Sequence, residues 1–166
     1  RHFPFDDLSA LIQSCSDWHT QEVTFLGGEP TLYPQIADAI KLVQTSNMLP
    51  RMVTNGLQGF AQFLDCFDGA QLPFLGFSID GSSSATHDPI RGTGTFARMI
   101  PNIERSQRLG YRSFAIVSVS RDNVNDLVPT LELSVPSLRS GHRVVRPLFP
   151  VPLQVPGELR QDLLVQ

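Results

Sequence analysis

Three short apolar runs in the sequence each end in polar residues that could bind a small charged ligand. These endings are Gly27-Gly28-Glu29-Pro30, Thr54-Asn55-Gly56 and Ser78-Ile79-Asp80. Glu29 offers a carboxylate to a cationic amine, while Ser78 and Asp80 offer groups that can hold ribose hydroxyls or an amine. The carboxyl ends of parallel strands share one edge of a β/α fold, and active sites lie there. We therefore expect the three endings to form one site.

Each ending also has a plainer structural explanation. A glutamate such as Glu29 is stabilised at a helix N-terminus without any ligand. Asn55 and Gly56 form a common turn pair, and Ser78 and Asp80 can accept from backbone donors of the next turn. The glycine pair is not a phosphate loop, since the sequence has neither a following Lys-Ser/Thr nor a G-x-G-x-x-G pattern. The case for a site rests on the shared position of the three endings.

A polar segment after the third ending adds a fixed positive charge. Arg91 carries a guanidinium fork suited to a carboxylate. His87 precedes Asp88, and because no activated nucleophile lies near them we expect a loop-stabilising contact between the two. The other histidines, His2, His19 and His142, are isolated and predict surface or core positions. A carboxylate, a guanidinium and several hydroxyl and amide groups together suit an aminoacyl or methionyl nucleoside.

The elements that must position these residues alternate along the chain. The pattern predicts strands over residues 22–26, 51–54, 74–79, 114–120 and 143–148. It predicts helices over residues 5–18, 33–46, 60–67, 96–109 and 124–133, a further helix over 158–165, and a polar loop over 82–94. Such alternation indicates an α/β fold with a parallel sheet. Five strands leave two possibilities, an open doubly wound sheet or an arc of an incomplete barrel.

Composition narrows the class of protein. The 166 residues predict a single domain, and 41% apolar residues allow a sizeable core. A net charge of −3 argues against nucleic acid and anionic membrane as partners, and no apolar run is long enough to span a bilayer, so we expect a cytoplasmic protein. Cys15 and Cys66 are remote from each other, which predicts two small buried residues rather than a metal site or a disulfide.

The sequence resembles the radical S-adenosylmethionine (SAM) enzymes, in particular the branch with C-terminal auxiliary-cluster domains that modifies peptides and proteins. The similarity extends over residues 23–147. The matching stretches are residues 23–31, 54–56, 77–81, 87–96 and 118–127. The resemblance implies a partial (β/α)6 TIM-like barrel with five parallel strands present and the first strand missing.

The resemblance also implies roles for single residues. Gly28 and Glu29 would bind the SAM amino group, Ser78 its ribose or methionine moiety, and Arg91 its carboxylate. The full set of cofactor-binding residues implied is Gly27, Gly28, Glu29, Pro30, Thr54, Asn55, Ser78, Asp80, Arg91 and Ser118. The substrate would be a peptide or a small molecule, and a reductant such as flavodoxin or ferredoxin would be a partner. The reaction would generate a 5′-deoxyadenosyl radical for hydrogen abstraction, with peptide maturation as the expected setting.

The sequence departs from the family at its defining motif. The C-x-x-x-C-x-x-C run, whose thiolates hold a [4Fe–4S] cluster, is absent, so this chain offers neither metal ligands nor catalytic residues of its own. We expect residues 1–166 to be a single radical SAM core domain, incomplete at both ends, with the cluster held elsewhere in the parent protein. Two alternatives stay open, a cluster-less domain that binds a peptide or nucleotide, and an unrelated β/α-barrel enzyme.

Overall fold

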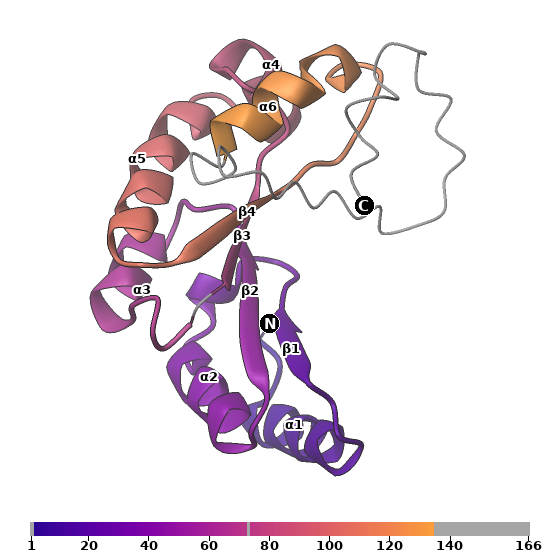
Figure 1. The fold of residues 1–166 in the computed structure, drawn as a ribbon, viewed down its shortest axis with the longest axis vertical. Coiled ribbons are helices and arrows are strands. Elements are labelled where there is room, and N and C mark those ends of the chain that lie inside the picture. The colour runs from indigo at the N-terminus through magenta and orange to yellow at the C-terminus, as the bar shows by residue number, and fades with distance from the viewer. Residues whose placement is uncertain (1, 73, 135–166) are drawn as a thin grey trace. The chain divides into compact units, whose positions relative to one another are not determined.

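A four-stranded parallel sheet is the centre of the computed structural model, which describes residues 2–72 and 74–134. The strands are β1 (Glu22–Phe25), β2 (Leu49–Thr54), β3 (Phe74–Ser78) and β4 (Arg112–Ile116). Each strand pairs with the next one along the chain, in the order β1-β2-β3-β4 (Figure 1). The predicted α/β class with a parallel sheet is therefore confirmed. The strand expected at 143–148 and the helix expected at 158–165 lie outside the described residues.

Helices connect the strands. The α-helices are α1 (Phe5–Asp17), α2 (Ile36–Thr45), α3 (Phe60–Cys66), α4 (Ser84–Arg91), α5 (Thr95–Arg108) and α6 (Leu127–Ser134), and the short 3-10 turns are η1 (Pro30–Leu32) and η2 (Val124–Asp126). Five of the α-helices were predicted within a few residues. Pro129 does not prevent α6, because it is the third residue of that helix, where the backbone N–H has no partner within the helix.

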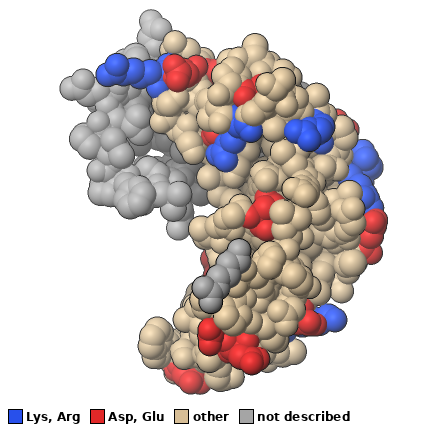
Figure 2. All heavy atoms as spheres, turned by 180° about the vertical axis from the view of Figure 1, so that it is seen from behind, with Lys and Arg blue, Asp and Glu red and all other residues tan. Residues whose placement is uncertain are grey.

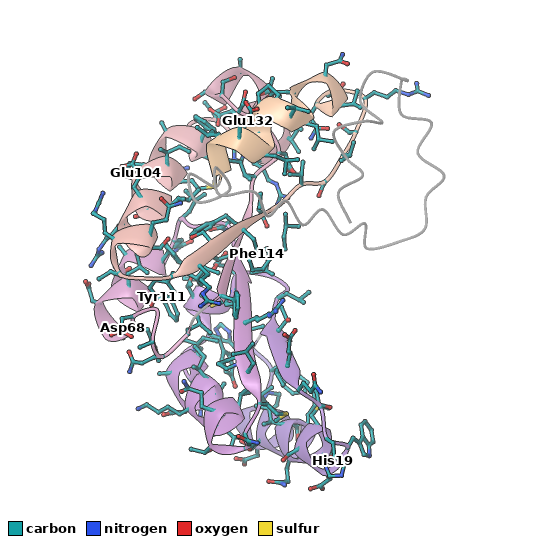
Figure 3. The ribbon with its side chains drawn as sticks, viewed as in Figure 1. His19, Asp68, Glu104, Tyr111, Phe114 and Glu132 are labelled. Carbon is teal, nitrogen blue, oxygen red and sulfur yellow. The ribbon has the colours of Figure 1, made fainter. Side chains whose placement is uncertain are left out.

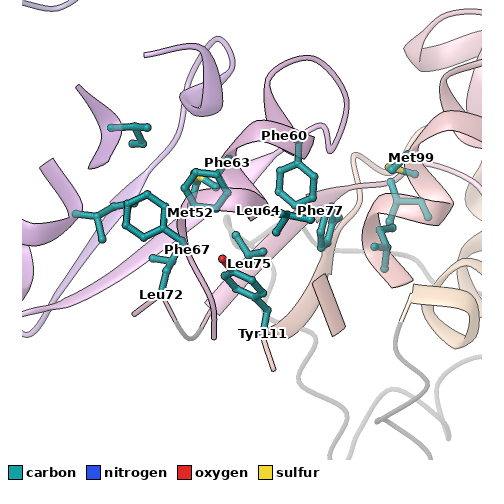
Figure 4. Close-up of a cluster of buried hydrophobic side chains, with 14 residues drawn as sticks. Met52, Phe60, Phe63, Leu64, Phe67, Leu72, Leu75, Phe77, Met99 and Tyr111 are labelled. Atoms are coloured by element: carbon teal, nitrogen blue, oxygen red, sulfur yellow. The ribbon is translucent and has the colours of Figure 1, made fainter. Parts of the chain in front are cut away.

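The main core lies between the sheet and the helices on one of its faces. Alternate residues of β2 are buried, and one of them, Met52, shares a cluster with Leu75 and Phe77 of β3. The helices contribute Ile36, Ile40, Phe60, Phe63, Leu64, Met99 and Ile103, and Phe67 follows directly after α3 (Figure 4). Phe60 meets Phe77 edge-on with ring centroids 5.5 Å apart. This packing fixes the last residues of β3, which carry part of the candidate site.

One sequence prediction about an element is wrong. Residues 82–94 were expected to be a polar loop, but α4 occupies most of that segment. Pro89 removes one hydrogen bond from the helix interior, and that cost argued for a loop. The helix forms because distant groups hold both its ends: Asp126 accepts from Thr86 Oγ1 at 2.5 Å, and Arg91 pairs with Asp80.

The surface agrees with the modest net charge. On the face shown in Figure 2, Lys and Arg side chains are interspersed with Asp and Glu and do not form one continuous basic area. No helix among residues 2–72 and 74–134 is both long and apolar enough to cross a bilayer. Cys15 is half-buried, but Cys66 is exposed, so the prediction that both cysteines are buried is wrong for Cys66.

Candidate functional site

The predicted site residues follow the carboxyl ends of adjacent strands. Thr54, the last residue of β2, is in register with Phe77, so Ser78 lies one residue further along β3. Ser78 is in turn in register with Ile116 at the end of β4. Because all the strands are parallel, the segments that follow them leave the same edge of the sheet.

Glu29 is the most heavily bonded of these residues. Its Oε1 accepts from Thr54 Oγ1 at 2.6 Å and from Thr31 Oγ1 at 2.8 Å. Its Oε2 accepts from the backbone N–H of Asn55 at 2.8 Å. The carboxylate also caps η1 through the N–H of Thr31. Glu29 therefore joins the end of β1 to the end of β2, and Oε2, with a single donor among the described residues, has a lone pair left for a ligand.

The backbone before Glu29 is open. Gly27 and Gly28 have φ values of +90° and +53°, and both residues are exposed. A Cβ added to either would meet no atom within 4 Å. Pro30 is buried and begins η1, where its missing N–H costs nothing. The end of β1 thus offers peptide groups and one carboxylate to a ligand, with free space above the two glycines.

A second cluster forms where β3 and β4 end. Arg91 Nε donates to Asp80 Oδ2, and the N–H of Ser118 donates to Asp80 Oδ1 at 2.7 Å. The side chain of Asp80 is fully buried, while that of Arg91 is 32% exposed. The predicted carboxylate-binding arginine is therefore anchored by the protein itself, and Asp80 acts as its anchor. The Ser118 residue is exposed and contributes its backbone to this cluster.

The structure also places Ser78, His87 and Asp88, and it does not bring the last two into the expected contact. Ser78 is half-buried at the end of β3. His87 and Asp88 were expected to contact each other, but the structure gives them separate hydrogen-bond partners. His87 Nδ1 accepts from the N–H of Asp80 at 3.2 Å, whereas Asp88 accepts from the N–H groups of Gly94 at 2.7 Å and Phe96 at 3.0 Å. Asp88 thereby caps the first turn of α5, and chiefly the Phe96 N–H holds its pKa below the usual value.

Sequence reasoning missed two residues that hold the second cluster together. Asn123 is buried and donates from Nδ2 to the carbonyls of Asp80 and Ser118, both at 3.0 Å. Asp126 accepts from the N–H and the Oγ of Ser82, both at 2.6 Å, and from Thr86. Burial raises the pKa of Asp126, but the hydrogen bonds from Ser82 and Thr86 outweigh it and hold the pKa below its usual value.

A hollow adjoins the residues around Glu29, since Asn55 both lines it and donates to Glu29. It has a volume of about 510 Å³ and is lined by Asn55, Leu57, Gln58, Arg98 and Asn102. Asn102 Nδ2 donates to the carbonyl of Gly56 at 2.7 Å, which ties α5 to the turn after β2.

The family resemblance implies two bound groups, SAM and a [4Fe–4S] cluster, and the residues present suit only the first of them. The two charges that would pair with an amino acid moiety are both present, as a Glu29 carboxylate with a remaining lone pair and a partly exposed Arg91 guanidinium. A [4Fe–4S] cluster does not fit these residues, since it needs three thiolates and the sequence has only Cys15 and Cys66. Among the described residues no group of three His, Cys, Asp or Glu side chains could hold a metal ion.

Comparison with known proteins identifies the family. A family model of the Radical SAM superfamily matches residues 1–134. The chain therefore belongs to the Radical SAM superfamily. It is 29% identical over 130 residues to the S-adenosylmethionine-dependent nucleotide dehydratase of Flammeovirga pacifica, with 75% of this chain and 44% of that protein covered. It is 26% identical over 102 residues to the mycofactocin maturase MftC of Mycobacterium ulcerans, with 61% and 28% covered.

A solved structure shows the same fold. The crystal structure of Streptococcus suis SuiB matches with a TM-score of 0.66 at 15% identity, over 81% of this chain and 31% of SuiB. The chain spans less than half the length of the curated relatives named here. Those relatives carry the names of enzymes, so they do not favour the alternative of a non-catalytic binding domain.

Proposed function

We propose that this chain is the SAM-binding core of a radical SAM enzyme. Glu29 carries the proposal: its carboxylate is fixed by Thr31, Thr54 and Asn55 at a strand end where the backbone of Gly27 and Gly28 is open. In the full-length protein, a [4Fe–4S] cluster held by residues outside this chain would supply the electron chemistry that makes SAM a source of a hydrogen-abstracting radical. The cluster ligands are not among these 166 residues, so the proposal for this chain is confined to binding and orienting SAM.

The proposed contacts follow from charge. Glu29 Oε2 would accept from the ligand ammonium, and the exposed side of the Arg91 guanidinium would donate to its carboxylate. Ser78 and Asn55 lie at the same edge and would contact the ribose or the methionine chain. Thr54 is buried, so it would act through Glu29, to which its hydroxyl donates. Gly27, Gly28 and Pro30 would shape the backbone against which the ligand lies, with Asp80 and Ser118 supporting Arg91.

Titration calorimetry of the full-length protein with SAM tests the binding proposal. Glu29→Gln should weaken SAM binding about ten- to a hundredfold, because a hydrogen bond to a charged group contributes about 1.5–3 kcal/mol. Glu22→Gln is the matched control. Glu22 is the first residue of β1, at the opposite end of the strand from Glu29, and pairs with Arg51 at 2.8 Å. Equal affinity of Glu29→Gln and Glu22→Gln would contradict the assignment.

For the substrate, we propose a peptide. MftC is named a maturase, and SuiB has been solved bound to its precursor peptide SuiA. Other relatives are named for nucleotide substrates, so the two classes must be tested together. Formation of 5′-deoxyadenosine should rise above its uncoupled rate when a peptide encoded beside the gene is added, and not when CTP or GTP is added. The opposite pattern would assign a nucleotide substrate.

A further inference from the structure

Helix α4 holds Asp80 at two points. His87 and Arg91 are four residues apart and lie on one face of α4. His87 Nδ1 accepts the backbone N–H of Asp80 at 3.2 Å, and Arg91 Nε donates to the Asp80 carboxylate. One helix face therefore fixes both the backbone and the side chain of the same residue.

The double contact determines what Arg91 can offer. Nε is the one guanidinium nitrogen of Arg91 that has a hydrogen bond within the described residues, and the side chain is 32% exposed. Nη1 and Nη2 are thus available for a ligand carboxylate as a planar pair. Their direction is set by Asp80, which also accepts the N–H of Ser118 and cannot turn independently.

We propose that His87 is a positioning residue that, as a neutral ring with its proton on Nε2, holds Asp80 and thereby aims Arg91 at the carboxylate of the ligand. The inference rests on the proposed SAM function for the identity of that ligand. The geometry of His87, Asp80 and Arg91 stands without it.

The neutral ring is required by the hydrogen bond and favoured by the surroundings. Nδ1 accepts a proton from the Asp80 amide, so in the neutral ring the proton is on Nε2. His87 is 2% exposed and packs against Phe96 with ring centroids 5.7 Å apart. Burial lowers the pKa of His87 from its usual value, while the charges of Asp80 and Asp88 raise it and that of Arg91 lowers it. Protonation at Nδ1 would place two hydrogens against each other.

The consequence is a defined pH dependence. The folded-state pKa of His87 lies below the unfolded value of 6.5, so the neutral-ring contact is intact above about pH 6.5. It is lost as the pH falls from there through the folded-state pKa. Affinity for SAM should decrease over the same interval, because Arg91 loses its alignment.

Two variants separate the hydrogen bond that His87 accepts from the space that its side chain fills. His87→Asn keeps an acceptor where Nδ1 lies and does not titrate, whereas His87→Leu fills similar space without an acceptor. SAM affinity of the full-length protein should fall about tenfold in wild type, relative to His87→Asn, between pH 7.5 and a pH below the folded-state pKa of His87 at which the protein is still folded. His87→Leu should be about tenfold weaker at both values. Titration of the ligand affects all three proteins equally and cancels in the comparison.

His19→Asn is the control, since His19 is exposed beyond the end of α1 (Figure 3). It should show the wild-type pH profile. Nitrogen-15 NMR of the wild-type imidazoles needs no SAM, and the His87 signal is identified by its absence from the spectrum of His87→Asn. It should show an unprotonated Nδ1 for His87 at pH 7.5. A protonated Nδ1, or a wild-type pH profile in His87→Asn, would overturn the inference. If the NMR signal is as expected but wild type binds SAM at no pH, the proposed SAM function is refuted and the assignment of His87 as a neutral ring that holds Asp80 stands.

Discussion

Arg91 donates from Nε to the buried carboxylate of Asp80, so the arginine expected to bind a ligand carboxylate is already held by a carboxylate of the protein. The pair has one fully buried partner and one partner that is 32% exposed. This asymmetry gives the arginine two functions. One side of its guanidinium stabilises the turn after β3, and the other remains available at the sheet edge.

Removing Arg91 should therefore destabilise the fold as well as the site. Arg91→Ala leaves the buried carboxylate of Asp80 with the Ser118 N–H but without its positively charged partner. We expect a loss of about 1–3 kcal/mol in the free energy of unfolding, less than for a fully buried pair because Arg91 is partly exposed. Urea denaturation measures it. Asp65→Ala is the control. It breaks an exposed ion pair with Arg105 and should cost about 0.5 kcal/mol or less. Equal losses in the two variants would show that Asp80 does not depend on Arg91.

Thr54 links Glu29 to the turn after β2. Its Oγ1 donates to Glu29 at 2.6 Å and accepts the N–H of Gly56 at 3.0 Å. Thr54→Val keeps the shape and removes both hydrogen bonds, so it should lower the free energy of unfolding by about 1–3 kcal/mol and weaken SAM binding. Thr54→Ser keeps both bonds and should retain the affinity. If Thr54→Val bound SAM as wild type does, Glu29 would not need this support.

The Tyr111 hydroxyl is a buried polar group in an apolar part of the core. Tyr111 is 4% exposed, and its hydroxyl is buried with no hydrogen-bond partner among the described residues (Figures 3 and 4). Burial raises the pKa of this phenol well above its usual value. Tyr111→Phe removes the unpaired group and should leave the free energy of unfolding unchanged or raise it by up to about 1 kcal/mol. Thermal denaturation measures this, and a clear loss of stability would reveal a partner for the hydroxyl.

Asp88 should make α5 sensitive to acid. The N–H of Phe96, with that of Gly94, lowers the pKa of Asp88 from 3.8, so its stabilisation is present above about pH 3.8 and is lost as the pH falls through the folded-state pKa. Asp88→Ala should lower the melting temperature at pH 7 and reduce its fall toward acid. Asp122→Ala, at an exposed aspartate, should change neither. An unchanged acid profile in Asp88→Ala would contradict the cap.

The strands and their common edge follow from local sequence pattern. Val23, Thr24 and Phe25 are β-branched or aromatic and precede a glycine pair, which is enough to predict a strand and its end. The alternation of strands with helices then predicts that successive strands run parallel. The carboxylate at Glu29 could be placed at the edge on these grounds alone.

The partners of the site residues could not be predicted in the same way. Asn123 is 43 residues from Asp80, and Asp126 is 40 residues from Thr86, so no local pattern reports either contact. The same contacts explain the missed helix α4. Pro89 is a correct local signal against a helix, and it is overridden by hydrogen bonds that only the folded chain supplies.

Gly27 and Gly28 have open space around them and positive φ angles, so the chirality of a substituted residue limits what these positions accept, and its size does not. A methyl group has room at both positions, yet an L-residue would be strained at these φ values. A D-alanine prefers the mirror-image region and would satisfy both conditions. The end of β1 should thus accept a side chain of one hand and resist its mirror image, and a semisynthetic protein could show the difference.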